Sequence, residues 1–555
     1  MRLIIVACSV FLMPKISFGQ SPDLVLVNGK IFTSDTSRLY VEALAITKGR
    51  ISAAGKSEEI EKLKTKITKR VDLAGRLVVP GFNDAHNHLP DGLRARHISV
   101  DGMDPAWQTI LDSIATLVKT TPVGHWIEGT IGVTIARSTE ANRFSLDKIA
   151  PKHPVRLLSW WGHVGIFNTL GMHSIGISNT QGDPKGAFYE RMANNKTLTG
   201  KAYEKNAYAP HTSYTTIASM RDEQALIQKL QQISQALLQV GITSYQNMCT
   251  GASPEDYIKY WNKAGLPLRL RLIRWGDVNS NGTLNIPSKT LPRVTSVLPL
   301  ATVSGTKWLL EGTPLEQGSA ELEPYPNRPD WYGRINYSMD EIESMCKDAL
   351  ARKDQIHFHI NGSMTIGKVL DLMSSMNVDW KAVRPRFEHG DQIDYTPEYL
   401  KKAKALGIIV VQNPTHFAPL PGMSSAAPTR SHGMALKTLL KNKIPLAIGS
   451  DGPFNPYLNI ILASTHPTRP SEAITREEAV IAYTYASAYA EFEEQNKGTL
   501  TVGKVADLAV LSDDIFSIDI PKLMQARSLL TIVNGEIAYD SGTLKVQPAP
   551  KSPAQ

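Results

Sequence analysis

Eight short apolar runs separated by helical patterns constrain the fold of this chain more than any other feature. Strands that alternate with helices are typical of a parallel α/β fold, and eight of them favour a closed (β/α)8 TIM-like barrel. The predicted strands cover residues 77–79, 242–246, 268–274, 307–310, 356–360, 386–389, 408–412 and 446–450.

The first two predicted strands are separated by a segment far longer than one helical connection requires. About a domain's worth of sequence is therefore inserted after the first strand. We assign residues 80–495 to the barrel, with the insertion at about 90–235. A chain of 555 residues is too long for one compact core, so a large domain with a smaller companion is expected.

Both ends of the chain contain short apolar runs joined by tight turns. Asn28-Gly29, Gly49-Arg50 and Asn534-Gly535 each lie between two such runs, and Asn-Gly is a strong hairpin signal. Neither end is large enough to fold alone, so residues 21–79 and 496–545 are predicted to pair in one β-sandwich. Two unrelated terminal appendages are the alternative.

The first 20 residues have the pattern of a secretory signal peptide. Arg2 precedes an apolar run at 3–13, and the small residues Ser17 and Gly19 follow as in a cleavage site. An uncleaved anchor is one alternative, although the run is shorter than the roughly 20 residues of a spanning helix. A lipoprotein site at Cys8 is another. We expect a periplasmic or secreted protein without stable membrane association after signal removal.

Composition narrows the range of partners. The formal net charge is +8, but the basic residues are interspersed with acidic ones, so we expect no nucleic-acid partner. After signal removal only Cys249 and Cys346 remain, too few for a disulfide framework. Residues 546–555, rich in Pro, Ala and Lys, are predicted to form a disordered tail. The expected partner is a small-molecule substrate, and the sequence is compatible with a homo-oligomer.

Two histidines follow the first apolar run at a spacing that suits metal binding. His86 and His88 lie in the stretch that begins at Pro80-Gly81. On an extended strand, side chains at i and i+2 point to the same face. Two imidazoles placed in this way can converge on one metal ion.

Other polar residues occur where later predicted strands end. His359, His389 and Asp451 each close such a strand, and Lys307 opens another. Barrel enzymes build their active sites from the carboxyl ends of the strands. A buried histidine, a helix-capping aspartate or a surface lysine is an ordinary structural residue when taken singly. Together these residues favour a metal site.

These motifs resemble those of the amidohydrolase superfamily, in the amidohydrolase 3 or YtcJ-like branch. The opening motif is Pro-Gly-Phe-Asn-Asp-Ala-His-Asn-His at 80–88, and the resemblance extends from the Asn28-Gly29 turn to 503–511. It implies a barrel with a β-sandwich built from both chain ends. It also implies one or two divalent metal ions, and imidazole and carboxylate ligands favour zinc.

By this resemblance His86 and His88 bind the more buried metal, and His359 and His389 bind the second. Asp451 would bind metal and shuttle protons. Lys307 lies where relatives carry a lysine that can be carboxylated to bridge two metals. A free ammonium cannot ligate a cation, so Lys307 would act as a carbamate or as a neutral amine.

A segment in the insertion resembles the substrate side of the family's cleft. It runs from Gly162 to Leu170 and contains His163 and Asn168. His163 could polarise a carbonyl or stabilise an oxyanion, and it could equally be a packed histidine.

Further along the chain, Glu311 stands where many relatives have aspartate, and Ser363 replaces a common acid. Glu311 is predicted to contribute to substrate binding. A structural role is expected for His357, whereas His416 and His432 are weak site candidates.

The predicted reaction is hydrolysis of a non-peptide carbon–nitrogen bond in an N-acyl, N-formyl or cyclic amide. A divalent ion lowers the pKa of water from about 15.7 to about 7, which provides hydroxide near neutral pH. Asp451 would take up the proton and deliver it to the departing nitrogen. The alternatives are a single-metal deaminase of an aminated ring, with Lys307 unmodified, and a secreted non-catalytic binding protein on the same fold.

Overall fold

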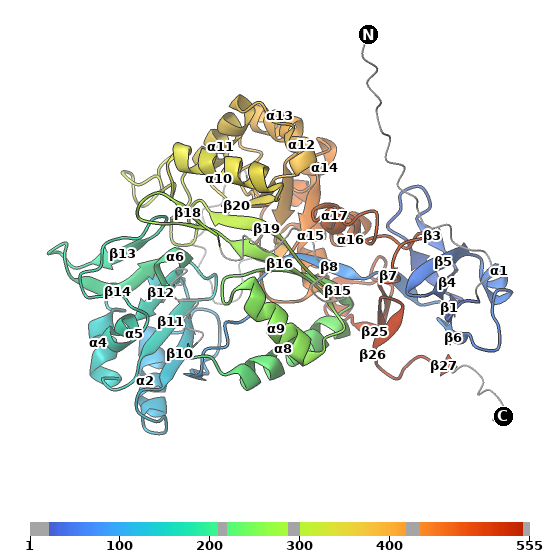
Figure 1. Ribbon diagram of the computed structural model, residues 1–555, viewed down its shortest axis with the longest axis horizontal. Coiled ribbons are helices and arrows are strands. Elements are labelled where there is room, and N and C mark those ends of the chain that lie inside the picture. Colours follow the sequence, from blue (N-terminus) through green and yellow to red (C-terminus); the bar gives the residue numbers. More distant parts are fainter. Residues whose placement is uncertain (1–20, 209–218, 287–299, 418–432, 548–555) are drawn as a thin grey trace, which may run out of the picture.

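The computed structural model describes residues 21–208, 219–286, 300–417 and 433–547. Figure 1 shows a β-rich part made from both chain ends at the right, the barrel in the centre and the insertion at the left. The predicted signal peptide lies outside the described residues. Within them, no helix has the length and apolar character needed to cross a membrane.

The central sheet has eight strands, and each is parallel to its neighbours. The two edge strands approach each other where Asp451 N donates to His86 O at 2.9 Å, so the sheet is nearly closed. The predicted α/β barrel is confirmed. Its strands are β8 (Phe82–Asn87), β15 (Ile242–Met248), β16 (Arg269–Trp275), β19 (Ala301–Leu309), β20 (Ile356–Ile360), β21 (Arg386–His389), β22 (Ile409–Gln412) and β23 (Leu446–Ile448).

One predicted barrel strand was wrong. Residues 77–79 belong to β7 (Leu77–Pro80), which pairs with β24 (Leu508–Leu511) and β2 (Lys30–Phe32) outside the barrel. The first barrel strand is β8, which starts two residues later and carries His86 within it. An apolar run has no feature that tells which of two adjacent sheets it joins, so the sequence could not separate them.

The outer helices follow from capping and apolar spacing, as α10 (Met339–Arg352) illustrates. Ser338 Oγ accepts from Glu341 N at 3.3 Å, and Glu341 Oε2 accepts from Ser338 N at 2.8 Å. This reciprocal pair satisfies two backbone donors at the helix start. The buried residues recur every three or four positions, so one stripe faces the barrel; they are Ile342, Met345, Cys346 and Ala349.

The remaining helices around the barrel are listed here with their bounds: α8 (Glu223–Gln239), α9 (Pro254–Ala264), α11 (Ser363–Ser375), α12 (Trp380–Val383), α13 (Pro397–Leu406), α14 (Lys437–Lys441), α15 (Pro456–Thr465), α16 (Arg476–Ala482) and α17 (Tyr485–Tyr489). Two short 3-10 helices occur at Pro414–Phe417 and Pro470–Glu472, and β17 (Asp277–Val278) pairs with β18 (Leu284–Asn285).

Two further sheets combine strands from both chain ends, which confirms the predicted sandwich. One has the order β27-β6-β1-β4-β5 and the other β26-β25-β24-β7-β2-β3. Apolar side chains from both sheets form one cluster. Elements not yet given bounds are β1 (Leu24–Val27), β3 (Tyr40–Val41), β4 (Ala43–Thr47), β5 (Arg50–Gly55), α1 (Ser57–Glu61), β6 (Lys69–Asp72), α18 (Ile520–Leu523), β25 (Ser528–Val533), β26 (Glu536–Asp540) and β27 (Val546–Gln547).

The three predicted turns have different outcomes. Gly49-Arg50 joins β4 to β5, and Asn534-Gly535 joins β25 to β26, so both hairpins are confirmed. The hairpin at Asn28-Gly29 was wrong, because β1 pairs with β4 and β6 whereas β2 lies in the other sheet. Here the chain crosses between sheets, and Asn28 adopts a positive φ of 58° at the corner.

The C-terminal end was also predicted incorrectly in part. Val546 and Gln547, assigned to a disordered tail, form β27 and pair with β6 through Val71 and Arg70. This edge pairing extends the sandwich by one strand, and the short apolar residue Val546 packs against its core.

The insertion has its own six-stranded sheet and its own apolar core. Its sheet order is β13-β14-β12-β11-β10-β9. The elements are β9 (Ala95–His97), α2 (Trp107–Val118), β10 (Trp126–Ile131), α3 (Val133–Arg137), α4 (Arg143–Ile149), β11 (Val155–Ser159), β12 (Val164–Phe167), α5 (Thr169–Ser174), β13 (Phe188–Arg191), β14 (Leu198–Tyr203) and α6 (Lys205–Tyr208).

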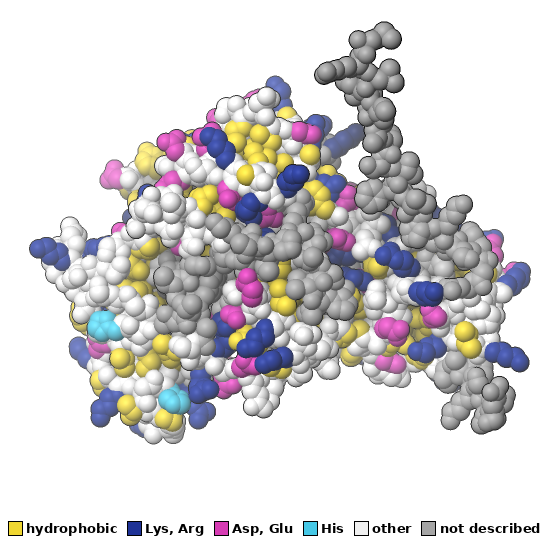
Figure 2. All heavy atoms as spheres, in the orientation of Figure 1, with side chains coloured by type: hydrophobic (Ala, Val, Ile, Leu, Met, Phe, Trp, Pro, Cys, Tyr) yellow, Lys and Arg dark blue, Asp and Glu magenta, His cyan; other side chains and the backbone are white. Residues whose placement is uncertain are grey.

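Surface charges on the face seen in Figure 2 are mixed, with Lys and Arg side chains lying beside Asp and Glu. No continuous basic stripe is visible among the residues described on that face. Cys249 and Cys346 are both buried, and they do not form a disulfide with each other. Packing therefore stabilises the described part of the chain without a disulfide between them.

Candidate metal centre and active site

The sequence-predicted residues His86, His88 and Asp451 meet at the carboxyl end of the barrel strands. His86 Nε2 lies 3.9 Å from Asp451 Oδ2, and His88 Nε2 lies 3.5 Å from Asp451 Oδ1. One ligand atom from each residue can be chosen so that all three lie within 4.8 Å of one another. Two imidazole nitrogens and a carboxylate at this spacing form a donor set suited to a divalent metal ion.

Nδ1 of His86 and Nδ1 of His88 each have hydrogen-bond partners that fix the orientation of the ring. His86 Nδ1 donates to Glu388 Oε2 at 2.6 Å, and His88 Nδ1 lies 3.2 Å from Met248 O and 3.1 Å from Thr250 Oγ1. Metal-ligating histidines almost always make such a second bond, which sets the tautomer. Nε2 of each ring therefore faces Asp451, and a metal ion there would replace the contacts that these two nitrogens make with Lys307 and Lys205.

Glu388 provides a buried negative charge that several side chains below the site contact. It is fully buried, and its carboxylate also accepts from His357 Nδ1 at 2.9 Å and from Arg386 Nε at 2.8 Å. Burial alone would raise its pKa, but Arg386 and His86 outweigh burial and hold the pKa of Glu388 well below its usual range. Glu388 is thus a carboxylate that orients His86. His357 contacts Glu388 deeper in the barrel.

A second group of donors includes a histidine that the sequence ranked as weak. His389 Nε2 lies 4.0 Å and His416 Nε2 lies 3.9 Å from Asp451 Oδ2, and the two rings stack with centroids 5.6 Å apart. These three residues also satisfy the geometry of a metal site. His416 lies in the short helix after β22, so its place beyond a barrel strand is the signal that could have identified it.

His359 is close to this group but outside both triads. Its ring centroid lies 4.7 Å from that of His389. Asn361 Nδ2 donates to His359 Nε2 at 3.0 Å, so this nitrogen already has a partner. Ligation by His359 would use the other ring nitrogen or displace the amide.

Lys307 lies on β19, and its side chain extends to His86. Its Nζ lies 2.8 Å from His86 Nε2 and 5.8 Å from the centroid of the Trp275 ring. Burial lowers the pKa of Lys307 to about 7, although Glu388 and Asp451 oppose this shift. A substantial fraction of the neutral amine is therefore present near pH 7.

Lys205 is a site residue that the sequence analysis missed. It begins α6 in the insertion, and its Nζ lies 3.4 Å from His88 Nε2 and 5.5 Å from the centroid of Trp275. Burial lowers the pKa of Lys205 to about 8. Nothing in the local sequence marks this lysine, because the insertion folds back onto the barrel only in three dimensions.

His163 lies beside His359 and belongs to a third cluster, with Glu204 and Glu316. Its ring centroid lies 4.7 Å from that of His359. His163 Nδ1 is hydrogen-bonded to Glu204 Oε2 at 2.8 Å, and Glu316 Oε1 lies 4.0 Å away. Burial raises the pKa of Glu204 to about 8 and lowers the pKa of His163 to about 4. Both side chains are therefore largely neutral near pH 7.

Asn168 is placed differently from the prediction that it binds substrate. Its Oδ1 accepts from Val155 N at 2.9 Å and from Gly171 N at 2.8 Å. Its Nδ2 donates to the carbonyls of Ala150 and His153. Asn168 is fully buried and caps α5, so its amide joins loops of the insertion.

Glu311 likewise uses its carboxylate inside the protein rather than toward a cleft. Its oxygens accept from Asn361 N and Ala320 N at 2.6 Å each, from Gly362 N at 2.8 Å and from Thr365 Oγ1 at 2.7 Å. Four donors fill its acceptor sites, so Glu311 fastens the loop after β19 to the start of α11. His432 lies outside the described residues.

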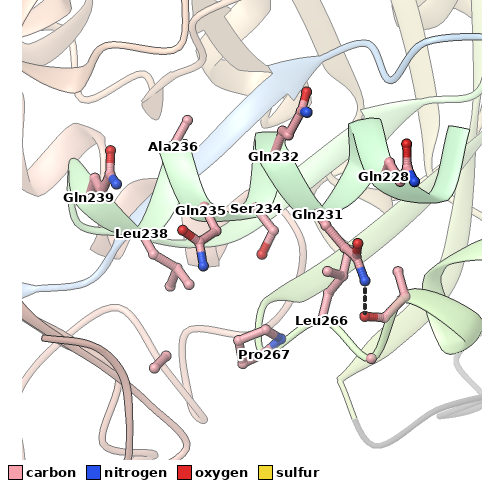
Figure 3. A pocket seen from close by; sticks show the side chains of 13 residues that line it. Gln228, Gln231, Gln232, Ser234, Gln235, Ala236, Leu238, Gln239, Leu266 and Pro267 are labelled. Atoms are coloured by element: carbon pink, nitrogen blue, oxygen red, sulfur yellow. Dashed lines mark hydrogen bonds between the residues drawn. The ribbon is translucent and has the colours of Figure 1, made fainter. Parts of the chain in front are cut away.

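A large surface hollow is not part of this site. It measures about 680 Å³ and lies on α8, where Figure 3 shows a row of glutamines along the helix with Leu266 and Pro267 opposite. None of the thirteen described residues that line it carries an ionisable side chain. It therefore lacks groups for metal binding or proton transfer.

Comparison with known proteins agrees with the fold and indicates the family. A profile of the amidohydrolase family matches residues 69–539. The N-substituted formamide deformylase of Arthrobacter pascens is 26% identical over 548 residues, covering 94% of this chain and 99% of that protein. The YtcJ amidohydrolase of Bacillus subtilis (strain 168) is 23% identical over 543 residues, covering 92% of this chain and 98% of that protein.

A solved structure shows the same fold. An uncharacterized metal-dependent hydrolase from Pyrococcus furiosus has a TM-score of 0.63 at 19% identity, covering 89% of this chain and 100% of that chain. The resemblance noted in the sequence motifs is confirmed by the match over most of the chain. The protein belongs to the amidohydrolase family and is a hydrolase that acts on carbon–nitrogen bonds other than peptide bonds.

Proposed function

We propose that this enzyme hydrolyses N-acyl or N-formyl amides of small molecules with a divalent metal ion. The proposal rests on the convergence of His86 Nε2 and His88 Nε2 on Asp451. Nδ1 of each ring is hydrogen-bonded, to Glu388 and to Thr250, and these bonds fix the orientation of the rings. The deformylase activity named for the Arthrobacter pascens relative supports an N-formyl compound as the first substrate class to test.

The donor set suits zinc, with manganese, iron or nickel as further fits. His86, His88 and Asp451 would hold one ion, and His389, His416 and Asp451 a second. A divalent ion bound here would acidify a water molecule and polarise the amide carbonyl.

Asp451 is suited to carry a proton between the reacting groups. Burial alone would raise its pKa, but His86, His416, Lys307 and Lys205 outweigh burial and keep the pKa below its usual value. Asp451 is therefore a carboxylate near neutral pH. It can accept a proton as the carbonyl is attacked and donate that proton to the leaving nitrogen.

His163 is suited to polarise the carbonyl oxygen. With a pKa near 8, Glu204 keeps its proton at neutral pH and can donate it to His163 Nδ1. The imidazole proton then resides on Nε2, which makes that nitrogen a donor. A donor fixed in this way can stabilise the charge that develops on the carbonyl oxygen.

Lys307 is a candidate for carboxylation. Its neutral amine can attack carbon dioxide, forming an N–C bond and releasing a proton to give a carbamate. The carbamate carries a negative charge and two oxygens, which could bridge two ions where an ammonium could not. With a single ion, Lys307 would stay an amine, as the deaminase alternative requires.

The decisive experiment combines metal content with the Asp451→Asn variant. We expect one or two equivalents of metal by elemental analysis, and loss of activity on chelation. Asp451→Asn should lower kcat/KM by about 100- to 10,000-fold, the usual contribution of general acid–base catalysis. Asp256→Asn, which removes a carboxylate paired with Arg221 away from the site, should have little effect.

Each alternative predicts a different result. A panel of N-formyl amines, N-acyl amino acids, cyclic amides and aminated rings separates amide hydrolysis from deamination. Full turnover without metal, or in Asp451→Asn, would contradict both enzyme readings. Tight ligand binding without turnover of any panel member would favour a binding protein.

Export is a separate proposal. The pattern of residues 1–20 supports a signal peptide, and N-terminal sequencing of the secreted or periplasmic protein would test cleavage near Gly19 or Gln20. Retention of the whole protein in the cytoplasmic fraction would contradict it.

A further inference from the structure

A second cavity shares two wall residues, Glu204 and Glu316, with the His163 cluster and is not explained by the chemistry above. It measures about 440 Å³, within the usual range for ligand pockets. Its walls come from β13 and β14 of the insertion, from the loop after β19 and from the end of α3. We call it the arginine pocket, after a set of cations and rings in its wall: Arg137, Arg328, Arg334, Phe188, Tyr203 and Trp331.

The three guanidiniums of the arginine pocket lack ion-pair partners. Within the described ranges, none of Arg137, Arg328 and Arg334 has a carboxylate oxygen within 4.0 Å. Arg334 donates to Asn336 Oδ1 at 3.2 Å, and Arg137 donates to Leu315 O. Burial lowers the pKa of Arg137 and Arg334, because desolvation of a cation is only partly offset by more distant carboxylates. Arginine nevertheless stays charged in proteins.

The carboxylates in the same wall are engaged elsewhere. Glu190 accepts from Thr199 Oγ1 at 2.7 Å and lies 3.6 Å from Lys201 Nζ. Glu204 is bonded to His163, and Glu316 accepts from Trp161 Nε1 at 2.7 Å. These carboxylates therefore do not neutralise the arginines by direct contact.

Aromatic rings hold two of the guanidiniums in position. Arg334 Cζ lies 4.6 Å from the centroid of Phe188, which in turn stacks on Tyr203 at 4.5 Å. Arg328 Cζ lies 4.7 Å from the centroid of Trp331. A guanidinium that lies over a ring still has N–H donors at its edge. These donors can form hydrogen bonds with a planar anion.

The arginine pocket is one imidazole ring away from the metal-site histidines. Glu204 and Glu316 line the pocket, and both approach His163 Nδ1, at 2.8 and 4.0 Å. His163 also lies beside His359, with ring centroids 4.7 Å apart. One substrate molecule could therefore place its amide at the metal centre and another group in the arginine pocket.

We propose that the arginine pocket binds a carboxylate carried by the substrate, so that the preferred substrates are N-acyl or N-formyl amino acids rather than neutral amides. This inference rests on the proposed function. Arginine pairs with carboxylate through two parallel hydrogen bonds, and three guanidiniums without a carboxylate partner among the described residues suit such an anion. A phosphonate at the same position shares this chemistry and is distinguished by the test.

Equilibrium binding to the metal-loaded full-length enzyme tests the proposal without turnover. The probes are N-methanesulfonyl derivatives of glycine, 4-aminobutyrate and 6-aminohexanoate, which an amidase cannot hydrolyse, each with its matched carboxamide and phosphonate. We expect at least one carboxylate to bind roughly 10- to 100-fold more tightly than its carboxamide in titration calorimetry. Butyrate alone should bind more weakly, since it lacks the group that reaches the metal.

Matched variants assign the preference to the arginine pocket. Arg334→Gln and the more exposed Arg328→Gln should each bring the carboxylate-to-carboxamide ratio toward one. Arg384→Gln should leave it unchanged, because Arg384 also lies over aromatic rings but pairs with Glu494 away from the site. If Arg334→Gln fails to fold, Arg328→Gln and the carboxylate-to-carboxamide ratios of the wild type still test the proposal.

Three results would overturn the proposal: equal binding of every acid and its carboxamide, a preference that survives both pocket variants, or binding of butyrate as tight as that of the sulfonamide acids. Tighter binding of the phosphonates would overturn the assignment to carboxylate. Failure of the proposed hydrolysis would appear separately, as an absence of turnover with the carboxylate preference intact.

Discussion

At the scale of single residues, the site depends on buried carboxyl groups that determine which ring nitrogen of a histidine carries the proton. Glu388 accepts from His86 and thereby leaves His86 Nε2 for a metal ion. Glu204 performs the corresponding task for His163, but with the opposite protonation. Both carboxylates are buried, and their different charges follow from Arg386, which lies beside Glu388. The same residue type is thus an anion in one position and an acid in the other.

The first prediction concerns Glu388→Gln. The change removes the charge that orients His86 and leaves Arg386 buried without its carboxylate. Metal affinity should fall about 10- to 100-fold, and stability by about 3–5 kcal/mol. Competition with a chelator and thermal unfolding measure the two effects. Glu494→Gln, which breaks the Arg384 pair, should leave metal affinity intact. Wild-type metal affinity in Glu388→Gln would contradict the assigned role.

The second prediction concerns pH. As pH rises through about 8, Glu204 loses its proton and becomes an acceptor, so the His163 proton moves to Nδ1 and Nε2 ceases to donate. The ratio kcat/KM should therefore fall above about pH 8. In Glu204→Gln the amide donates at every pH, and this alkaline decline should shift upward or vanish. Glu494→Gln, which changes a carboxylate paired with Arg384 away from the site, is the control. An unchanged decline in Glu204→Gln would refute the mechanism.

At the scale of elements, several motif residues act by joining segments rather than by touching substrate. Glu311 fastens the loop after β19 to α11, and Asn168 connects β11, α5 and the preceding turn. The segment after β19 that Glu311 holds also contains Glu316, which lies 4.0 Å from His163 Nδ1. Asn168 lies at the other end of β12 from His163, so its hydrogen bonds stabilise the fold of the insertion.

The third prediction tests this structural role of Asn168. Asn168→Ala removes the side-chain partner of Val155 N, Gly171 N and His153 O, so it should cost about 1–3 kcal/mol in unfolding free energy. The Ala150 carbonyl keeps its bond from His153 N at 3.3 Å. The value of kcat/KM at a temperature where the variant is folded should stay near that of the wild type. Asn142→Ala, which removes the cap of α4, is a matched control with a smaller expected loss. A large loss of kcat/KM with normal stability would restore the substrate-binding role.

At the scale of the whole molecule, the two chain ends form one sandwich, linked by polar contacts to the barrel. β24, from the C-terminal end, lies between β7 and β25 in its sheet. Asp507 accepts from Arg269 Nε at 2.5 Å and from Arg269 Nη2 at 3.1 Å, which links the sandwich to β16. The N-terminal strands therefore need the C-terminal ones as neighbours.

The fourth prediction follows from this arrangement. Deletion of residues 496–555 removes β24 to β27 and exposes the edge of β7 and the apolar cluster shared by both sheets. The truncated chain should be degraded or recovered as aggregate, as measured by soluble yield and limited proteolysis. Deletion of 548–555 keeps every described strand and should preserve the yield. A soluble, folded protein from the longer deletion would contradict the shared sandwich.

Much of this architecture could be predicted from local patterns. Seven of the eight predicted barrel strands correspond to barrel strands, because apolar runs buried on both faces leave a clear signal. The family motif led to His86, His88, His389 and Asp451, which the fold brings together. The errors at 77–79 and at Asn28-Gly29 have one cause. Local periodicity identifies a strand but not the sheet to which it pairs.

The sequence alone determined the fold class, the family and four of the five residues in the two candidate metal triads, since these depend on periodicity and on the chemistry of side chains. Tertiary structure alone decided that Lys205, His416 and Glu204 join the site, and that Asn168 and Glu311 support loops instead. Hydrogen-bond partners and burial set each of these roles, and the partners lie on segments far away in the chain. Such proximity arises only when the insertion and the barrel pack together.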